Sequence, residues 1–416
     1  MSRVRLLHFA DAHIDVANYG RRDPETGLPV RVMDFLRALD FVIDTALEEK
    51  VDLVLFAGDA FKDRHPTPTF QREWAKRILR LVRHQIPVVL LVGNHDVSPA
   101  WGRAHTLELF RVFQVEGIHV VDRVSVLTPE DLGVPLYLIG IPWIHRSGLL
   151  AYLDISPRDP REWHEALHVW IEEFVHRALE EKPPNTPTVL LAHAMVPGAQ
   201  AGWERLFSLD FEFHLPGGLV RDPRLDYVAL GHVHKHQDLN PGRHPPVVYA
   251  GSLERMSVDE DEEKGCLVVE VEPGASTYRW VPIPHLRPFL RRWVRVEQPE
   301  GATQQVLEAL GPPKALEDAV VRLVVECTPE VERALDLRAI YRHAEKALEF
   351  RLVKRVQREH RLRLPPDTPI AQYTPLELLE FYWRHQGKTP EEFEPLKKLA
   401  RRIIEAVEGA QGHDSA

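Results

Sequence analysis

Five stretches of the sequence place aspartate, histidine or asparagine directly after a run of apolar residues. The apolar runs read as buried β-strands, because several of them are nearly continuous hydrophobic segments. The polar residues that follow the strands are Asp11 with His13, Asp59, Asn94 with His95 and Asp96, His193, and His232 with His234. In open α/β sheets, ligands bind at the carboxyl ends of the strands. We therefore expect these side chains to meet at one edge of the fold.

Carboxylates, imidazoles and an amide oxygen are ligands that suit hard or borderline divalent cations. The set contains no thiolate, so the pattern does not favour a structural zinc site of the cysteine type. An aspartate alone at a strand end, such as Asp59, is able to bridge two cations, and two cations form a clamp for in-line attack on phosphorus. Each short pattern by itself is more often an ordinary turn. All five in this order indicate a two-metal phosphoesterase site.

The elements that must position these residues follow a regular order. From residue 3 to about 285, apolar strands alternate with amphipathic helices expected over 32–49, 68–84, 103–113 and 161–182. This alternation predicts a layered α/β domain. A proline-rich stretch at 281–288 and a second one at 364–369 mark boundaries. We expect a catalytic domain over 1–285, a small α/β cap domain over 286–363 and a C-terminal helical tail over 370–408.

The ordered motifs D-x-H, G-D, G-N-H-D, H and G-H-x-H resemble those of the calcineurin-like metallophosphoesterase superfamily. Within it, the opening RLLHFADAHID, the GHVHK followed by VVYAGSLER and the cap-and-tail layout are similar to SbcD-type nuclease subunits of SbcC–SbcD DNA-repair complexes. The resemblance implies an α/β fold with a two-sheet sandwich flanked by helices. It also implies a Mn²⁺-dependent DNA exonuclease and endonuclease that hydrolyses phosphodiester bonds by a two-metal mechanism in double-strand break repair.

The same resemblance, applied motif by motif, implies two ligand sets that share one bridging aspartate. The first metal ion would be held by Asp11, His13, Asp59 and His234. The second would be held by Asp59, Asn94, His193 and His232. His95 would protonate the leaving 3′-oxygen or stabilise the transition state, a role that suits an imidazole titrating near neutral pH. Asp96 would act behind it by orienting His95.

One position departs from the pattern of the SbcD-type relatives. Lys62 stands three positions after Asp59, where several of those relatives have a second histidine. A lysine there is able to contact a DNA phosphate as a point charge, but it cannot shuttle a proton as an imidazole does. The same stretch, with Asp63 and Arg64, resembles the G-D-x-x-D-R of protein phosphatases. A phosphomonoesterase or protein phosphatase of the same superfamily therefore stays open as the alternative, whereas the complete ligand set disfavours a non-enzymatic scaffold.

A basic run at 351–363 contains six lysines and arginines and one glutamate. In a cap beside the metal site it would meet the DNA backbone, where affinity comes mainly from phosphate neutralisation. A solvated face is an equally open interpretation of such a run. The candidate DNA contacts are Lys62, Arg64, Lys354, Arg355 and Arg358.

The composition sets limits on location and partners. Hydrophobic residues make up 44% and charged residues 27%, which is typical of a globular chain rather than a disordered one. The sequence has no apolar run of the roughly 20 residues that a membrane span needs, no recognisable secretory signal and only two cysteines, so we expect a cytoplasmic protein without a membrane partner. A net charge of −10 argues against indiscriminate nucleic-acid binding over the whole surface. The resemblance further implies a homodimer, formed through the helix at 103–113, and an SbcC-like SMC-type ATPase subunit that docks on the tail.

Overall fold

The computed structural model describes residues 3–97, 104–144, 160–200, 202, 214–357, 373–385 and 387–411. The chain divides into two compact units. The first comprises residues 1–294, 303–325 and 336–353, and the second comprises 295–302, 326–335 and 354–416. The chain passes between the units inside three strands, β13 (Phe289–Val296), β14 (Val320–Cys327) and β15 (Glu349–Val356). Within the described ranges, no helix is long and apolar enough to cross a membrane.

Six strands form the first sheet of the first unit, in the order β12-β11-β1-β2-β3-β4. Their bounds are β1 Val4–Phe9, β2 Leu53–Phe56, β3 Val88–Leu91, β4 Ile118–Val121, β11 Gly265–Val271 and β12 Thr277–Pro282. Strands β1 to β4 run parallel, whereas β11 pairs antiparallel with both β1 and β12. The carboxyl ends of β1, β2 and β3 therefore lie on the same edge of the sheet.

The second sheet also has six strands, in the order β5-β6-β7-β8-β10-β9. Their bounds are β5 Ser125–Leu127, β6 Tyr137–Ile141, β7 Thr188–His193, β8 Tyr227–Gly231, β9 Gln237–Asp238 and β10 Val247–Tyr249. Strands β6, β7, β8 and β10 are parallel, and the edge strands β5 and β9 are antiparallel to their neighbours. This sheet thus presents the carboxyl ends of β6, β7 and β8 together.

The two sheets pack face to face through side chains that alternate along each strand. In β2, Leu53 and Leu55 enter the layer between the sheets, whereas Val54 and Phe56 pack against the cluster that contains the helices. Leu191 of β7 enters the same central layer from the second sheet. A strand that is buried on both faces needs apolar side chains at every position, which explains the nearly continuous hydrophobic runs in the sequence.

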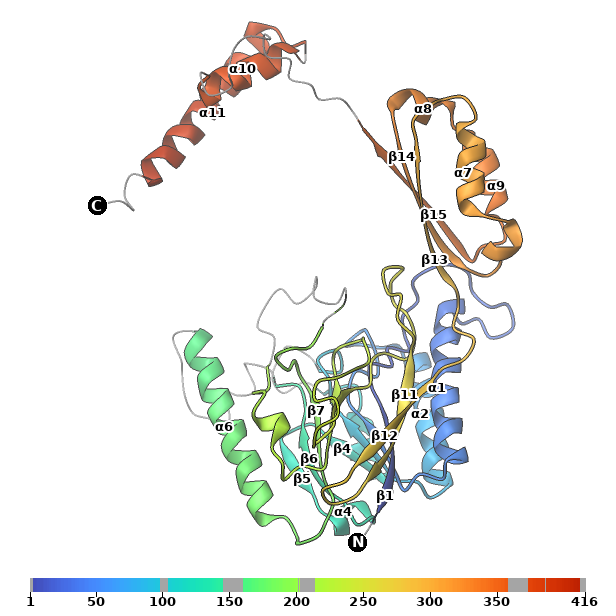
Figure 1. Ribbon diagram of the computed structural model, residues 1–416, viewed down its shortest axis with the longest axis vertical. Coiled ribbons are helices and arrows are strands. Elements are labelled where there is room, and N and C mark those ends of the chain that lie inside the picture. The colour runs from blue at the N-terminus through green and yellow to red at the C-terminus, as the bar shows by residue number, and fades with distance from the viewer. Residues whose placement is uncertain are drawn as a thin grey trace. The chain divides into compact units, whose positions relative to one another are not determined.

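Helices cover the outer face of each sheet (Figure 1). Helices α1 (Val30–Glu48) and α2 (Pro68–Arg83) pack on the first sheet, and α6 (Pro160–Glu181) packs on the second. The shorter helices of this region are α3 (Glu108–Val112), α4 (Pro129–Leu132) and the 3₁₀ helix η2 (Leu219–Arg221). The result is a helix–sheet–sheet–helix sandwich, so the predicted two-sheet fold flanked by helices is confirmed. The helix expected over 103–113 is shorter than predicted, because its regular part is α3 alone.

A three-stranded sheet follows, in the order β13-β14-β15, with helices α7 (Ala302–Leu310), α8 (Pro329–Ala334) and α9 (Leu337–His343) and the 3₁₀ helix η3 (Pro313–Leu316). The second unit contains α8 together with α10 (Pro375–His385) and α11 (Pro390–Gln411), whereas α9 and most of α7 belong to the first. Helices α10 and α11 both begin at a threonine whose hydroxyl and N–H donate to a glutamate three residues later, a capping arrangement that marks a helix start. The two helices pack through the stacked rings of Trp383 and Phe393, 5.8 Å apart.

Candidate metal centre

Five strand ends deliver the predicted ligands to one place. β1 is followed by Asp11 and His13, β2 by Asp59, β3 by Asn94, and β8 by His232 and His234, while β7 ends at His193. Strands β1 to β3 belong to the first sheet, and β7 and β8 belong to the second. The site therefore lies at the seam between the two sheets, on the edge formed by their carboxyl ends, as ligand sites in α/β folds do.

Four of the predicted ligands have a left-handed backbone conformation. The φ angles are 49° at Asp11, 41° at His13, 64° at Asp59 and 95° at His232. Residues with a side chain adopt this region at a cost of about 1–3 kcal/mol each, and such strain concentrates at functional sites. The turns after β1 and β2 hold each other in place, because the N–H groups of Ala12 and His13 both donate to the carbonyl of Asp59, at 2.9 and 3.2 Å.

The donor atoms of the first predicted ligand set converge. One ligand atom each from Asp11, His13 and His234 lies within 4.8 Å of the others, and the same holds for Asp11, Asp59 and His193. All five side chains are buried, with residue exposures of 5% or less. The Asp59 carboxylate lies near one histidine of each predicted set, with Oδ2 3.8 Å from His13 Nε2 and 3.5 Å from His193 Nε2. Asp11 is the residue common to both groups of converging atoms, and the bridging role of Asp59 stays a prediction.

The second predicted set converges on the amide oxygen of Asn94. This Oδ1 atom lies 2.8 Å from His193 Nε2 and 3.0 Å from His232 Nδ1. The backbone N–H of His232 donates to both carboxylate oxygens of Asp11, at 3.1 Å, which ties the end of β8 to the end of β1. The structure therefore brings together all seven side chains that the sequence predicts as ligands.

Two of the histidines are oriented as metal-binding imidazoles are. Nδ1 of His193 donates to the carbonyl of Ala57 at 2.7 Å, and Nδ1 of His13 donates to the carbonyl of Phe61 at 3.3 Å. Both rings consequently point Nε2 toward Asp59. Nε2 of His13 is fully buried and has no hydrogen-bond partner among the residues that the structure describes, an arrangement that costs free energy unless a ligand meets it. The donors therefore fit divalent cations of the oxygen- and imidazole-binding kind.

The electrostatics of the site point the same way. Burial lowers the pKa of His13 to about 3, so its imidazole is neutral and able to donate a lone pair. Burial also acts to lower the pKa of His193, but the adjacent carboxylate of Asp59 outweighs it and raises the pKa to about 9. The pKa of Asp59 is lowered, against the effect of burial, by the charges of His193 and His95. Without a metal ion the carboxylates of Asp59 and Asp11 thus hold a proton on His193, and a cation bound at the same place would displace that proton.

Two glycines leave the space that the side chains of Asp59 and His193 occupy. A Cβ atom added at Gly93 would lie 2.2 Å from Asp59 Oδ1, and one added at Gly58 would lie 2.4 Å from His193 Nδ1. These distances are far below van der Waals contact, so no other residue type fits at either position without displacing a predicted ligand. The glycines of the G-D and G-N-H-D motifs are therefore part of the site through the space that they leave.

His95 lies beside the predicted ligands and faces a cavity. Its backbone N–H donates to Asp59 Oδ1 at 2.8 Å, and its Nδ1 atom lies 2.8 Å from the carbonyl oxygen of Lys62. A carbonyl only accepts, so Nδ1 carries a hydrogen and Nε2 is the atom left for chemistry. The ring of His95 packs edge-on against that of His13, with centroids 5.2 Å apart.

Asp96 differs from the expectation that it orients the His95 side chain. Its carboxylate accepts four hydrogen bonds, from the N–H groups of Asp59, Gly93 and Ala60 and from the hydroxyl of Thr106, at 2.8–3.1 Å. The imidazole of His95 instead donates to Lys62. Asp96 therefore supports the site by binding the backbone of two ligand-bearing turns, because its short side chain points back under the β3 turn. Burial and the charge of Asp59 raise the pKa of Asp96 to about 6.

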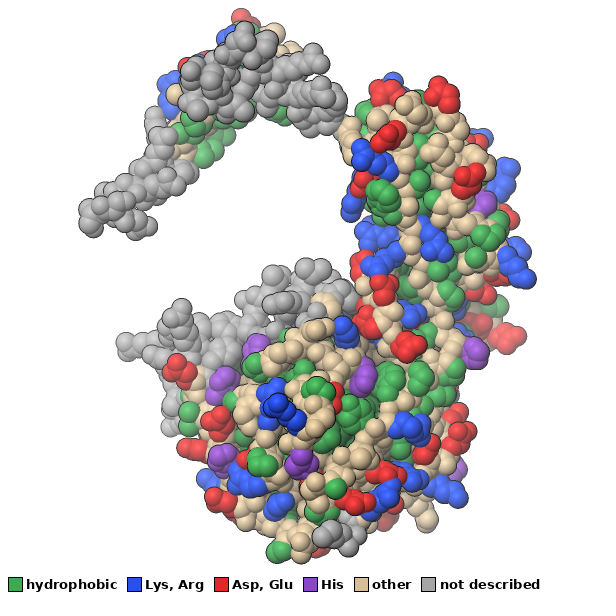
Figure 2. Space-filling view, in the orientation of Figure 1, with side chains coloured by type: hydrophobic (Ala, Val, Ile, Leu, Met, Phe, Trp, Pro, Cys, Tyr) green, Lys and Arg blue, Asp and Glu red, His purple; other side chains and the backbone are tan. Residues whose placement is uncertain are grey.

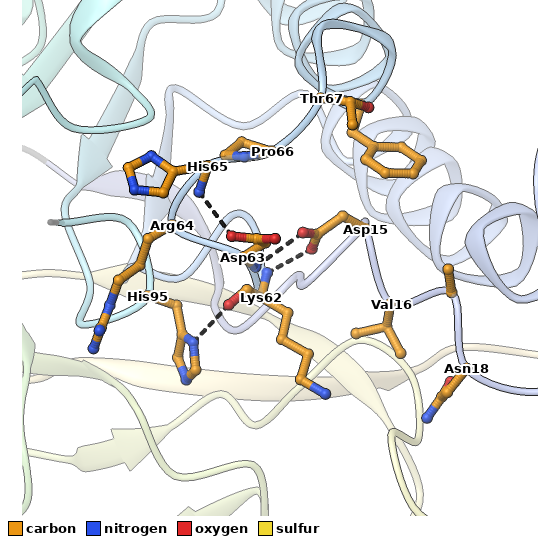
Figure 3. Close-up of a pocket in the computed structure, with 12 residues that line it drawn as sticks. Asp15, Val16, Asn18, Lys62, Asp63, Arg64, His65, Pro66, Thr67 and His95 are labelled. Carbon is orange, nitrogen blue, oxygen red and sulfur yellow. Dashed lines mark hydrogen bonds between the residues drawn. The ribbon is translucent and has the colours of Figure 1, made fainter.

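Lys62 and Arg64, predicted as DNA contacts, lie in the exposed loop after β2. Together with His95 they line a cavity of about 860 Å³. In Figure 3 the side chains of Lys62 and Arg64 lie on either side of His95. The structure thus places two positively charged side chains near His95, the predicted general acid.

The other predicted DNA contacts belong to the second unit. Lys354 and Arg355 lie on β15, and each has a carboxylate partner. Nζ of Lys354 lies 2.5 Å from Glu332, and the guanidinium of Arg355 lies 3.4 Å from Glu326. Arg358 falls outside the described residues.

Two residues of the site were missed by sequence reasoning. The ring of Trp143, just after β6, lies 5.0 Å from that of His232 and 6.1 Å from that of His193. The signal was present, because Trp143 follows an apolar strand as the predicted ligands do, but an indole ring offers no metal-binding atom that would mark it. Asp15, two positions after His13, binds the loop that contains Lys62. The sequence has no spacing rule that identifies this contact.

Comparisons with known proteins agree with this geometry. Residues 4–236, more than half of the chain, match the family described as calcineurin-like phosphoesterase. The chain belongs to this family, which confirms the predicted superfamily.

Among its relatives is the DNA double-strand break repair protein Mre11 of Methanosarcina acetivorans, 26% identical over 74% of this chain and 43% of that protein. The SbcD component of the nuclease SbcCD from Rhodobacter capsulatus is 29% identical over 69% of this chain and 71% of its own length. A solved dimetal phosphatase from Danio rerio covers 66% of this chain and 98% of its own, with 11% identity and a TM-score of 0.39. The chain thus spans less than half of the first of these relatives.

Proposed function

We propose that the protein is a Mn²⁺-dependent DNA nuclease, acting as exonuclease and endonuclease in the repair of double-strand breaks. The observation that carries this proposal is the convergence of seven donor side chains at the seam of the sandwich, five of them buried and two, Asn94 and His232, partly buried. Membership of the calcineurin-like phosphoesterase family supports hydrolysis of a phosphate ester. The names of the Mre11 and SbcCD relatives support DNA as the substrate.

In this proposal Asp11, His13, Asp59 and His234 would hold one divalent ion, and Asp59, Asn94, His193 and His232 would hold a second. Bound there, such ions supply positive charge that activates water and offsets the charge developing on phosphate oxygens. His95 would hold a second proton at Nε2, in addition to the one on Nδ1, and pass it to the leaving 3′-oxygen, a contribution of about 10²–10⁴ in rate. Asp96 holds the backbone that positions these groups.

DNA binding in this proposal depends on local groups of cations rather than on the overall charge. Basic and acidic side chains are interspersed on the visible surface, in keeping with a net charge of −10 (Figure 2). Lys62 and Arg64 would contact phosphates beside His95, and Lys354, Arg355 and Arg358 would contact the backbone from the cap. The assignment divides the chain into a catalytic domain at 1–285, a DNA-facing cap at 286–363 and a helical tail at 370–408.

The proposal also includes two protein partners. Leu109, Val112 and Phe113 around α3 are 51%, 63% and 71% exposed, which suits a homodimer contact made by this helix. On the tail, Leu396, Leu399 and Ile403 are 39–55% exposed. Apolar side chains repeating at helical spacing suit a helix that docks on a partner, here an SbcC-like SMC-type ATPase subunit.

A phosphomonoesterase or protein phosphatase is the second candidate, because Asp63 and Arg64 follow Asp59 in the spacing of the phosphatase G-D-x-x-D-R motif. The two functions separate in one experiment. Linear duplex DNA and a generic phosphomonoester are offered side by side to the full chain with Mn²⁺. We expect cleavage of DNA, and preferential hydrolysis of the monoester would support the alternative.

A variant pair ties that activity to the site. Asp59→Asn removes the bridging charge and should abolish cleavage and lower the bound Mn²⁺ at both positions. Asp44→Asn makes the same chemical change on the surface, where the carboxylate only pairs with Arg80, and should behave as the wild type. Full activity in Asp59→Asn would exclude a mechanism that depends on two metals.

A further inference from the structure

Asp15 accepts hydrogen bonds from the backbone of the loop that contacts His95, the predicted general acid. Its Oδ1 atom accepts the N–H of Lys62 at 2.5 Å, and its Oδ2 atom accepts the N–H of Asp63 at 2.9 Å. Asp15 and Lys62 both line the cavity next to His95, and Figure 3 draws the two hydrogen bonds. Both carboxylate oxygens are thus engaged by two successive backbone groups.

The same stretch of backbone binds His95 on its other side. The N–H of Asp63 and the C=O of Lys62 belong to one peptide group, which is planar and holds these two groups in opposite directions. Its N–H meets Asp15 and its C=O meets Nδ1 of His95, at 2.8 Å. A single rigid peptide therefore connects the carboxylate to the imidazole.

We propose that Asp15 is a positioning residue for His95, acting through the Lys62–Asp63 peptide to hold the proton on Nδ1 and keep Nε2 for the reaction. The inference rests on the proposed function, because it assigns the support of the acid in that reaction. A carboxylate on the N–H polarises the peptide and strengthens its C=O as an acceptor. The backbone of His95 is fixed by its N–H bond to Asp59. The position of the Lys62 carbonyl therefore sets the direction of the His95 ring.

The consequence of losing Asp15 follows from the geometry. Without the carboxylate, the peptide is free to rotate its C=O away from His95, and Nδ1 loses the acceptor that fixes the tautomer. His193 keeps its partner, the carbonyl of Ala57, whereas the carbonyl of Phe61 that binds His13 belongs to the same peptide as the N–H of Lys62, which Asp15 also binds. The contact of His13 with Phe61 is the longer of the two, at 3.3 Å against 2.8 Å for that of His95 with Lys62, so the loss should lower the rate of reaction more than it lowers metal binding.

The test compares Asp15→Ala with Asp23→Ala in the full chain. Asp23 is a matched control, because its carboxylate also accepts a backbone N–H, that of Thr26 at 2.8 Å, but it does not line the cavity beside His95. At saturating Mn²⁺, Asp15→Ala should lower kcat on duplex DNA by about 10- to 100-fold with KM unchanged, and it should lower bound Mn²⁺ by less than this factor. Asp15→Asn, which keeps one acceptor oxygen, should lose less, and Asp23→Ala should match the wild type.

A second readout does not depend on activity. Nitrogen NMR of the metal-free protein, labelled at histidine, reports which ring nitrogen carries the proton, and the His95 signals are those missing from His95→Gln. Wild type should show hydrogen on Nδ1, and Asp15→Ala should show a mixture of tautomers. An unchanged tautomer, a kcat within twofold of wild type, or Mn²⁺ lost in parallel with activity would each overturn the inference. Wild-type protein that cleaves no DNA would refute the proposed function, while the NMR comparison would still decide the role of Asp15.

Discussion

Replacing Gly93 by alanine tests whether the space around Asp59 is as tight as the structure shows. The added Cβ would lie 2.2 Å from Asp59 Oδ1, 2.5 Å from Asp59 N and 2.8 Å from Asp59 Cγ. Carbon atoms pack favourably at about 3.5–4.0 Å, so either the Gly93 turn or Asp59 must move by on the order of 1 Å. Neither is free to move, because Asp96 binds the N–H groups of both.

The expected cost follows from that conflict. Forcing one extra carbon into a packed interior costs about 1–3 kcal/mol, and a shift of Asp59 also displaces the carboxylate that we propose as a shared metal ligand. We therefore expect Gly93→Ala to lower the melting temperature of the first unit by a few degrees, at about 2–4 °C per kcal/mol. Disturbed support of a metal ligand weakens metal binding by about 10- to 100-fold, so bound Mn²⁺ should also fall.

Gly218→Ala is the control for this substitution. Gly218 has a helical backbone, with φ −67°, and a Cβ added there would meet nothing within 4 Å. Calorimetry with and without Mn²⁺ gives the stability, and elemental analysis after dialysis gives the bound metal. If Gly93→Ala melted and bound Mn²⁺ as Gly218→Ala does, the packing described around Asp59 would be wrong.

Four further outcomes are expected. His95→Ala should keep its metal, measured by elemental analysis, and lose about 10²–10⁴ in cleavage rate; loss of metal would make His95 a ligand. Removing residues 365–416 should leave cleavage of short DNA intact and abolish co-purification with an ATPase partner, whereas a lower melting temperature with loss of cleavage would make the tail part of the core. Phe113→Asp should convert a dimer into a monomer by light scattering, and a wild type that is monomeric at micromolar concentration would refute the dimer. Burial lowers the pKa of His8 from 6.5 to about 3, so below pH 6.5 the unfolded chain binds a proton that the folded chain does not, and the fold loses stability as the pH falls. Between about pH 7 and pH 5 the wild type should lose about 2 kcal/mol more in unfolding free energy than His8→Gln, and equal losses would contradict this.

The sequence predicted the central strands well because their burial leaves a simple pattern. β2 and β3 are apolar at every position, and each ends at a turn that carries a ligand. The edge strands β5 and β12 were not predicted, because β5 has only three residues and β12 is partly exposed, with polar residues between its apolar ones. Strands that are buried on both faces were therefore predictable from the sequence, whereas these strands at the edge of a sheet were not.

The residues of the candidate site also differ in whether the sequence predicts their role. Residues that act through their side chains, such as Asp59 and His193, appear in the sequence as polar groups after strands. Residues that act on the backbone do not, because any N–H is an equivalent target and spacing carries no information about it. Asp96 binds the turns of Asp59 and Gly93, and Asp15 binds the peptide beside His95, and both contacts required the folded chain.

The predicted ligands are all recognisable in the sequence, but they come together only when the two sheets pack, because they lie at the seam between them. The ligands after β1 to β3 come from one sheet and those at β7 and β8 from the other, so no single sheet holds a whole site. The contact across the seam is close, because a Cβ added at Gly231 would lie 2.0 Å from the carbonyl oxygen of Ala57, the same oxygen that orients His193. A cation bound by both sheets stabilises only the packed sandwich, so metal affinity and the stability of the sheet interface are linked by mass action.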